Sequence, residues 1–289
     1  MTIRVNGVDI DGSSVTLPAT PAEVLLDAAS PNTILALDPA GIGVGVSVAD
    51  MRTALGVTSD PGLPSSGLLA DWRASALSLS DGDPVSAWAP SVGSPGSLEN
   101  TGSARPTFRA TGTPLGAPCV EFDGVNTSLR LTPPAGLPDG SDAATIVAII
   151  CGGRVQGTEG KQHVVHLGTA GYAATRGLAL DYAGKGWTTH EWGMAAVSSD
   201  ALPRDRQVCV LGHSYDGAVV SLYVDGVVHA TGTLALATGT NELAVGNRVA
   251  GSSERGAFKL IRLAIYDHAL TAAEWAQVMA HARAALGAR

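Results

Sequence analysis

Short apolar runs, separated by turn residues, make up most of the chain from residue 68 onward. In the segment AVVSLYVDG, Val220, Leu222 and Val224 alternate with Ser221 and Tyr223, as expected for a strand with one buried face. The run ATIVAII is almost continuously apolar, which predicts a central strand covered on both faces. Glycine, proline, asparagine or aspartate separates nearly every pair of runs, which is typical of a β-sandwich.

The same pattern predicts further strands along the whole segment. Their sequences are GLLADWRA, PVSAWA, PTFRA, CVEFDG, SLRLT, QHVVHLG, LALDYAG, VCVLGHSYDG, AVVSLYVDGVVHATG, LAVGNR and FKLIRLAIYD. Trp72 and Trp88 lie within two of these strands, so we expect both indoles in the core.

One convincing helix is predicted, at the end of the chain. Thr271 and Glu274 form a capping box, and Leu270 and Trp275 have the spacing of a hydrophobic staple. An apolar stripe then continues through Val278, which predicts an amphipathic helix of roughly 14 residues packed on the sandwich. The expected fold is therefore all-β, an antiparallel jelly-roll sandwich with a short C-terminal helix.

The chain before the sandwich has a different character. Residues 1–57 contain three strand-like runs (TIRVNGVDI, ILAL and GVGVSV) and a brief helical run, ADMRTAL. They include few large apolar side chains, so we expect this small β-rich module to pack on a neighbouring chain. Residues 58–67 (TSDPGLPSSG) are predicted to be a linker, and residues 68–289 to be the sandwich domain.

Composition narrows the classes of partner. The formal net charge is -8 and no cluster of lysine and arginine occurs, which argues against nucleic acid. No basic amphipathic stretch predicts membrane contact. The opening MTIRVNGVDIDG lacks the apolar core of a signal peptide. The three widely spaced cysteines are expected to be free thiols. Both features lead us to expect synthesis in a reducing cytoplasm.

Four phrases in the sandwich segment follow one another in a familiar order. They are GLLADWRASALSLSDGDPVSAWAP, CVEFDGVNTSLRL, GHSYDGAVVSLYVDGVVHATGTL, and LAVGNR followed by FKLIRLAIYDHALTAAEW. Together they resemble the laminin G-like and pentraxin-like branch of the concanavalin A-like lectins and glucanases. This resemblance implies a β-sandwich that binds a ligand, with calcium as an optional cofactor at its rim. The loop residues that match such a calcium site are Asp123, Asn126 and Asp216, although aspartate and asparagine also favour turns.

The residues do not predict catalysis. Glucanases of this superfamily carry paired glutamates in an E-x-D-x-x-E arrangement, and no such run occurs here. The segment Gly212–Gly217 (GHSYDG) superficially resembles a G-x-S-x-G nucleophile elbow, but its spacing is wrong and it lies in a predicted hairpin. We therefore expect no catalytic residues.

The loop GKGWTTHEWG is the best candidate for ligand binding. Tryptophans flanked by polar groups and glycines are suited to stacking on sugar rings, although both indoles could equally serve as packing residues. The candidate binding residues are Lys185, Trp187, His190, Glu191 and Trp192. His163 and His166 are three residues apart, which places them on opposite faces of a regular strand, so a shared metal is not expected.

A looser resemblance concerns the string ILALDPAGIGVGVSVADMRTALGV, which is similar to the attachment region of phage tail-fibre and minor structural proteins. It implies a virion protein, assembled in the host cytoplasm, that binds other virion subunits through residues 1–57. The sandwich is then expected to bind host surface polysaccharide, and the chain to form a homo-oligomer, with a trimer as our guess. A purely architectural capsid or tail subunit and a bacterial surface adhesin remain alternative interpretations.

Overall fold

The computed structural model describes residues 3–5, 8–10, 33–37, 43–47, 60–114, 116–154, 161–181, 186–194, 196–201, 207–249 and 254–286. The chain forms two compact units, Met1–Pro61 and Gly62–Arg289. The boundary falls within the predicted linker, and Leu63, from the second half of that linker, is buried in the larger unit.

Among its described residues, the smaller unit has two pairs of antiparallel strands. Strand β1 (Ile3–Val5) pairs with β2 (Val8–Ile10), and β3 (Thr33–Leu37) pairs with β4 (Gly43–Ser47). These strands coincide with the predicted apolar runs. Asn6 and Gly7, which join the two halves of the run TIRVNGVDI, and the predicted ADMRTAL helix lie outside the described residues.

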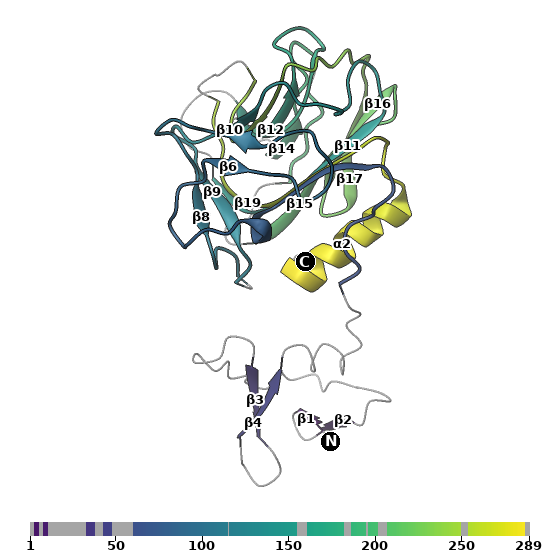
Figure 1. The fold of residues 1–289 in the computed structure, drawn as a ribbon. Helices are drawn as coiled ribbons and strands as arrows, with labels where there is room; N and C mark the ends of the chain where they lie inside the picture. Colours follow the sequence, from purple (N-terminus) through teal and green to yellow (C-terminus); the bar gives the residue numbers. More distant parts are fainter. Residues whose placement is uncertain are drawn as a thin grey trace. The chain divides into compact units, whose positions relative to one another are not determined.

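The larger unit is a sandwich of two antiparallel sheets (Figure 1). The eight-stranded sheet has the order β17-β16-β15-β11-β19-β9-β8, and β5 also pairs with β19. The bounds of these strands are β5 Leu68–Arg73, β8 Thr107–Arg109, β9 Cys119–Asp123, β11 Ala144–Arg154, β15 Val208–Tyr215, β16 Val219–Val224, β17 Val227–Thr233 and β19 Ala257–Tyr266.

The second sheet has seven strands, in the order β14-β13-β12-β18-β10-β7-β6. Their bounds are β6 Ala87–Trp88, β7 Leu98–Glu99, β10 Leu129–Leu131, β12 Lys161–Gly168, β13 Thr175–Asp181, β14 Gly186–Thr189 and β18 Glu242–Val245. A short 3-10 helix, η1 (Ala74–Ala76), follows β5. Strands β7 and β14 were not among the predicted ones, whereas each predicted strand of the sandwich overlaps an observed strand.

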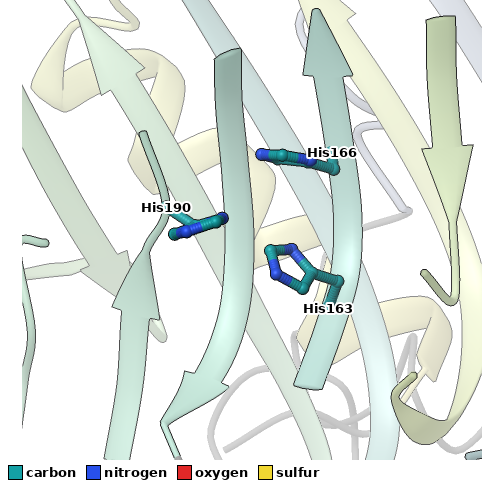
Figure 2. A group of neighbouring side chains, drawn as sticks. All are labelled: His163, His166 and His190. Atoms are coloured by element: carbon teal, nitrogen blue, oxygen red, sulfur yellow. The ribbon is translucent and has the colours of Figure 1, made fainter. Parts of the chain in front are cut away.

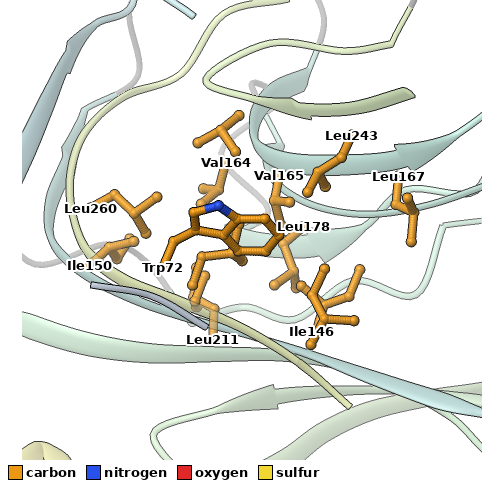
Figure 3. Close-up of a cluster of buried hydrophobic side chains, with 14 of the residues drawn as sticks. Trp72, Ile146, Ile150, Val164, Val165, Leu167, Leu178, Leu211, Leu243 and Leu260 are labelled. Carbon is orange, nitrogen blue, oxygen red and sulfur yellow. The ribbon is translucent and has the colours of Figure 1, made fainter. Parts of the chain in front are cut away.

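The main hydrophobic core lies between the two sheets. Trp72 from β5 is fully buried there and, as Figure 3 shows, lies among aliphatic side chains of both sheets, including Ile150 of β11 and Val165 of β12. Trp88 is also fully buried in this core. Both tryptophans therefore occupy the positions expected from the sequence.

A second hydrophobic layer lies on the other side of the eight-stranded sheet, under helix α2 (Ala272–Leu286). Thr271 Oγ1 accepts a hydrogen bond from the Glu274 backbone N–H, and Glu274 Oε2 accepts one from the Thr271 N–H, which confirms the capping box. The Trp275 ring stacks on Tyr223 of β16, with centroids 4.2 Å apart. The helix thus covers the sheet as predicted.

Strand β11 separates these two layers. Ile146, Ala148 and Ile150 face the core between the sheets, whereas Val147 and Ile149 face the helix. This confirms the prediction of a central strand covered on both faces, since alternate side chains of one strand point to opposite faces. No helix within the described ranges is long and apolar enough to cross a membrane.

Tight hairpins join β15, β16 and β17. Asp225 and Gly226 adopt φ values of 50° and 78°, which two-residue turns between antiparallel strands require. The Asp225 carboxylate also accepts a hydrogen bond from the Val210 N–H, which ties this turn to β15. The Asp225-Gly226 pair thus forms the turn between β16 and β17.

Candidate functional site

Strand β12 carries two histidines on the outer face of the seven-stranded sheet. Val165 and Leu167 point into the core between the sheets, so His166 points outward. The pairing of β12 with β13 shifts register between His163 and Val165, which marks a β-bulge at Val164. The bulge turns Val164 into the core as well and leaves His163 on the same outer face as His166.

The prediction that His163 and His166 lie on opposite faces is therefore wrong. Their ring centroids are 4.7 Å apart, because the bulge adds one residue to the regular alternation. Bulges depend on pairing with the neighbouring strand, and nothing in the local sequence QHVVHLG distinguished this one.

A third histidine completes the group. His190 follows β14 and donates its backbone N–H to the Gly177 carbonyl over 3.0 Å. Its ring centroid lies 4.7 Å from that of His163 and 5.1 Å from that of His166. Figure 2 shows His163 and His166 on one strand, with the three rings gathered in one place. We call this group the histidine cluster.

Gly177 makes room for the cluster. It pairs with His166 across β13 and β12, and a Cβ atom at this position would lie only 2.6 Å from His166 Cδ2 and 2.9 Å from the Val165 carbonyl oxygen. Any larger residue would therefore displace the His166 ring.

The histidine cluster is neutral at neutral pH. Burial lowers the pKa of His163, lowers the pKa of His166 well below its ordinary value, and lowers the pKa of His190 to about 3. The His163 and His166 side chains are fully buried, and His190 is partly exposed. The ring nitrogens of the cluster are thus available as lone-pair donors or as N–H donors, without a positive charge.

The chain after β18 supplies a cation, a carboxylate and a backbone donor beside the cluster. Arg248 Nη1 lies 3.0 Å from Glu254 Oε2, and that carboxylate oxygen lies 3.5 Å from His163 Nε2. The backbone N–H of Val249 donates to His166 Nδ1 over 3.1 Å. Arg248, Val249 and Glu254 therefore lie beside the histidine cluster.

An aromatic surface adjoins the cluster. The Arg248 guanidinium carbon lies 4.2 Å from the centroid of the partly exposed Trp192 ring, which is a cation–π contact. Tyr172 is 73% exposed, and its ring lies directly against Gly193. The Ala173 N–H donates to the Trp192 carbonyl over 2.8 Å, which joins the two aromatic segments. We call Tyr172, His190, Trp192 and Arg248 together the outer-face site.

The predicted binding loop is only partly a loop. Residues Gly186–Thr189 form strand β14 at the edge of the seven-stranded sheet, and Trp187 points into the core with 2% exposure. The interpretation of Trp187 as a sugar-stacking residue is therefore wrong. Tryptophan and threonine favour strands, but the flanking glycines are typical of loops and led to the prediction of a loop.

Glu191 points inward, opposite to its neighbours His190 and Trp192. It is fully buried, and its carboxylate lies 2.8 Å from His213 Nε2 and accepts a hydrogen bond from Thr189 Oγ1 over 3.0 Å. The interpretation of Glu191 as a ligand-binding residue is therefore wrong as well, because its carboxylate is buried and bonded within the protein. Lys185 lies outside the described residues.

Tyr172 and Arg248 were missed at the sequence level. Tyr172 lies in the segment GYAATRG and Arg248 in GNRVAG. The turns around both residues are rich in glycine and alanine, a composition that also occurs in ordinary surface loops. Their proximity to Trp192 arises from the pairing of β12, β13 and β18.

The predicted calcium residues occupy two turns. Asp123 Oδ1 accepts hydrogen bonds from the backbone N–H groups of Val125, Asn126 and Thr127. Burial opposes ionisation of Asp123, but these donors outweigh it and lower the pKa of the carboxyl.

Asp216 Oδ1 likewise accepts the N–H groups of Val219 and Ala218, which lower its pKa. Both carboxylates therefore act in turns, and a calcium role for Asp123, Asn126 and Asp216 stays a prediction.

The GHSYDG segment forms the end of β15 and the following turn, as expected. Ser214 Oγ lies 3.1 Å from Thr145 Oγ1 on the neighbouring strand β11, and Ser214 is buried. The hydroxyl is thus part of a sheet and not of a strand-to-helix elbow.

Comparison with known structures identifies the architecture. A sialidase from Trypanosoma rangeli, solved with sialic acid, superposes with a TM-score of 0.54 and 14% identity over 88% of this chain. The match spans 36% of the sialidase, so the chain is much shorter than that protein. Domain 4 of AbnA, an extracellular arabinanase from Geobacillus stearothermophilus solved with arabinotriose, superposes with a TM-score of 0.54 and 16% identity. This match covers 75% of our chain and 100% of the arabinanase domain.

The binding domain of Paraclostridial Mosquitocidal Protein 1 is also similar, with a TM-score of 0.51, 10% identity, and coverage of 74% of this chain and 52% of that one. At such low identity these likenesses concern the fold alone. No curated protein matches the sequence. A family model does match residues 131–276, about half of the chain, and runs from the end of β10 into helix α2. The chain belongs to the concanavalin A-like lectin/glucanases superfamily.

Proposed function

We propose that the sandwich binds a carbohydrate at the outer-face site. The observation that carries this proposal is the Trp192 indole, partly exposed and held under the Arg248 guanidinium, with the exposed Tyr172 in the adjoining segment. Aromatic faces stack on the apolar faces of sugar rings, and exposed aromatic side chains are costly unless they serve a contact. His190 and Arg248 supply polar groups to orient sugar hydroxyls.

The superfamily and the solved relatives support this proposal. The sialidase and the arabinanase domain were solved with sialic acid and arabinotriose, respectively. We propose that the present chain shares binding of a glycan, without proposing the same sugar or the same site. The binding is non-covalent, and no catalytic residue is proposed.

A glycan array with the full-length protein tests the proposal. We expect Trp192→Ala and Tyr172→Ala to lose binding of any glycan that the wild type retains. Val227→Ala is the control, because Val227 is 60% exposed but lies on β17 of the other sheet. Repeating the array with EDTA tests whether calcium takes part. Equal binding by the wild type and both aromatic variants contradicts this location of the site.

The finer proposal is that the chain is a phage-type virion protein, attached through residues 1–57 and directed at host surface polysaccharide. It is supported by the resemblance of residues 34–57 to attachment regions and by the division of the chain at Pro61. Immunogold labelling of particles with an antibody against the sandwich tests it. Light scattering of the full chain tests the proposed homo-oligomer, for which a trimer is our starting hypothesis.

An architectural role is the second candidate. Strand β17 lies at the edge of the eight-stranded sheet and exposes Val227 and Val228, which are 60% and 45% accessible. Edge strands with exposed apolar residues are suited to pairing with another chain. Failure of every glycan to bind a folded protein, together with particle labelling, favours this role.

A further inference from the structure

We propose that the histidine cluster of His163, His166 and His190 binds a divalent transition-metal ion such as Zn²⁺. This inference does not depend on the proposed carbohydrate binding. One ligand nitrogen from each ring can be chosen such that all three lie within 4.8 Å of one another. Among the described residues, these three histidines are close enough to act as ligands of one metal ion.

The distances fit a site that closes on its ion. Zinc binds imidazole nitrogen at about 2.0–2.1 Å, so nitrogens in a tetrahedral site lie about 3.3 Å apart. The nitrogens of the cluster have to approach one another by at most roughly 1.5 Å relative to their present separation. Rotation of the imidazole rings, above all of the partly exposed His190, supplies such a movement.

Buried nitrogens without hydrogen-bond partners provide an independent reason for a ligand. Among the described residues, both ring nitrogens of His163, together with His166 Nε2 and His190 Nδ1, are buried and have no hydrogen-bond partner. A buried polar atom without a partner costs about 1–3 kcal/mol. These atoms belong to three rings whose centroids lie 4.7–5.1 Å apart. Coordination of one ion relieves this cost at several rings together.

The donor type selects the class of ion. Neutral imidazole nitrogens suit zinc, copper, nickel and cobalt, whereas calcium and magnesium prefer oxygen ligands. The burial of His163 and His166 keeps both rings in the neutral form that coordinates a metal. Three protein ligands leave a further coordination position for water or a bound molecule.

Glu254 orients His163 for this role. Its Oε2 atom lies 3.5 Å from His163 Nε2, so the ring can direct its N–H toward the carboxylate and offer Nδ1 to the ion. Arg248 holds the same carboxylate over 3.0 Å. A carboxylate behind a coordinating histidine fixes the tautomer of the ring and strengthens it as a ligand.

His166 has to change its partner on binding. Its Nδ1 atom now accepts the Val249 N–H, so the proton of the ring lies on Nε2. Coordination through Nε2 moves this proton to Nδ1 and breaks the contact with Val249. We therefore expect metal binding to shift the NMR resonance of the Val249 backbone amide. Binding of the ion to His190 alone does not require this shift.

Zinc binding to the full-length protein tests the inference. The protein is stripped with EDTA, titrated with ZnCl₂ by calorimetry, and its retained zinc is measured by mass spectrometry after gel filtration. We expect about one ion per chain for the wild type. His190→Gln and His163→Gln lose this ion, and Glu254→Gln weakens binding by roughly 10–100-fold.

His229→Gln is the matched control, since His229 is exposed on β17 of the other sheet, and it retains the zinc. Substitution with Co²⁺ adds a signature, because a tetrahedral site with histidine ligands gives intense visible absorption that His190→Gln alters. His190 is partly exposed, so its variant remains informative if His163→Gln fails to fold. The inference is overturned if the wild type retains no zinc, or if His190→Gln retains it with an unchanged cobalt spectrum.

Discussion

The guanidinium carbon of Arg248 lies 4.2 Å from the centre of the Trp192 ring, and Nη1 of the same guanidinium lies 3.0 Å from Glu254 Oε2. The indole, the cation and the carboxylate thus form one continuous arrangement on the outer face of the seven-stranded sheet. This arrangement fixes the Trp192 ring at the surface without burying it completely, and it connects the outer-face site to the histidine cluster through His163.

Arg248→Ala is expected to release the Trp192 ring. A cation–π contact of this kind contributes about 0.5–2 kcal/mol, so glycan binding should weaken by roughly twofold to thirtyfold. Arg248→Lys should retain part of the effect, because an ammonium group also binds an aromatic face. Glycan titration with tryptophan fluorescence measures both variants. Identical affinity in wild type and Arg248→Ala contradicts the role of this contact.

Replacement of Trp187 and of Trp192 by alanine should lower the free energy of unfolding by different amounts. Trp187→Ala removes a side chain with 2% exposure from the core, so we expect a loss of about 3–5 kcal/mol in the free energy of unfolding. Trp192→Ala should cost about 1 kcal/mol, since its ring is already partly in solvent. Denaturant unfolding of both variants checks this, and equal losses would show that the two indoles are packed alike.

The buried pair of Glu191 and His213 is expected to be structural. Glu191→Ala leaves His213 Nε2 without its partner at 2.8 Å, and an unsatisfied buried group costs about 1–3 kcal/mol. A double-mutant cycle with His213→Phe isolates the coupling between the two side chains. Glycan binding should stay unchanged in every folded variant, because Glu191 is fully buried.

The start of helix α2 should respond to pH through His268. Hydrogen bonding to Asp267, followed by that to Glu274, raises the pKa of His268. A group with a raised pKa in the folded protein stabilises it fully below the unfolded value of about 6.5, and this contribution disappears as pH rises through the folded pKa. Wild-type protein should therefore lose its advantage over His268→Gln as pH rises above about 6.5.

Thermal unfolding of both proteins from acid to alkaline pH measures this difference. Because the side chain of His268 is 31% exposed, added salt should reduce the effect. If the difference in melting temperature between the two proteins does not change with pH, His268 stabilises the protein by packing against Tyr266. The centroids of these two rings lie 6.1 Å apart.

Much of the sandwich could be predicted because its strands obey local rules. The alternation around Leu222, the doubly apolar run of β11 and the capping box at Thr271 each depend on neighbouring residues alone. The folded structure contains all three features, because the burial of apolar side chains and the backbone hydrogen bonds both favour the locally preferred conformation. The all-β class with one terminal helix followed directly.

The site could be predicted only in part. His190 and Trp192 were identified from their loop sequence. The bulge at Val164 depends on how β12 pairs with β13, and Glu191 lies inward beside His213 of the other sheet. Tyr172 and Arg248 reach Trp192 only through that same pairing. A single sequence contains no direct measure of these contacts, so local periodicity placed His163 and His166 on opposite faces.

Strand β11, with one hydrophobic layer on each side, has a consequence for how the protein opens. Helix α2 can detach and expose the layer around Val147 while the layer around Ile146 between the sheets stays closed. The amides of β11 should then exchange with solvent only on complete unfolding, whereas those of α2 exchange through a smaller opening. Detachment of helix α2 is therefore expected to leave the sheet that carries His163 and His166 closed, since that sheet packs on the other hydrophobic layer.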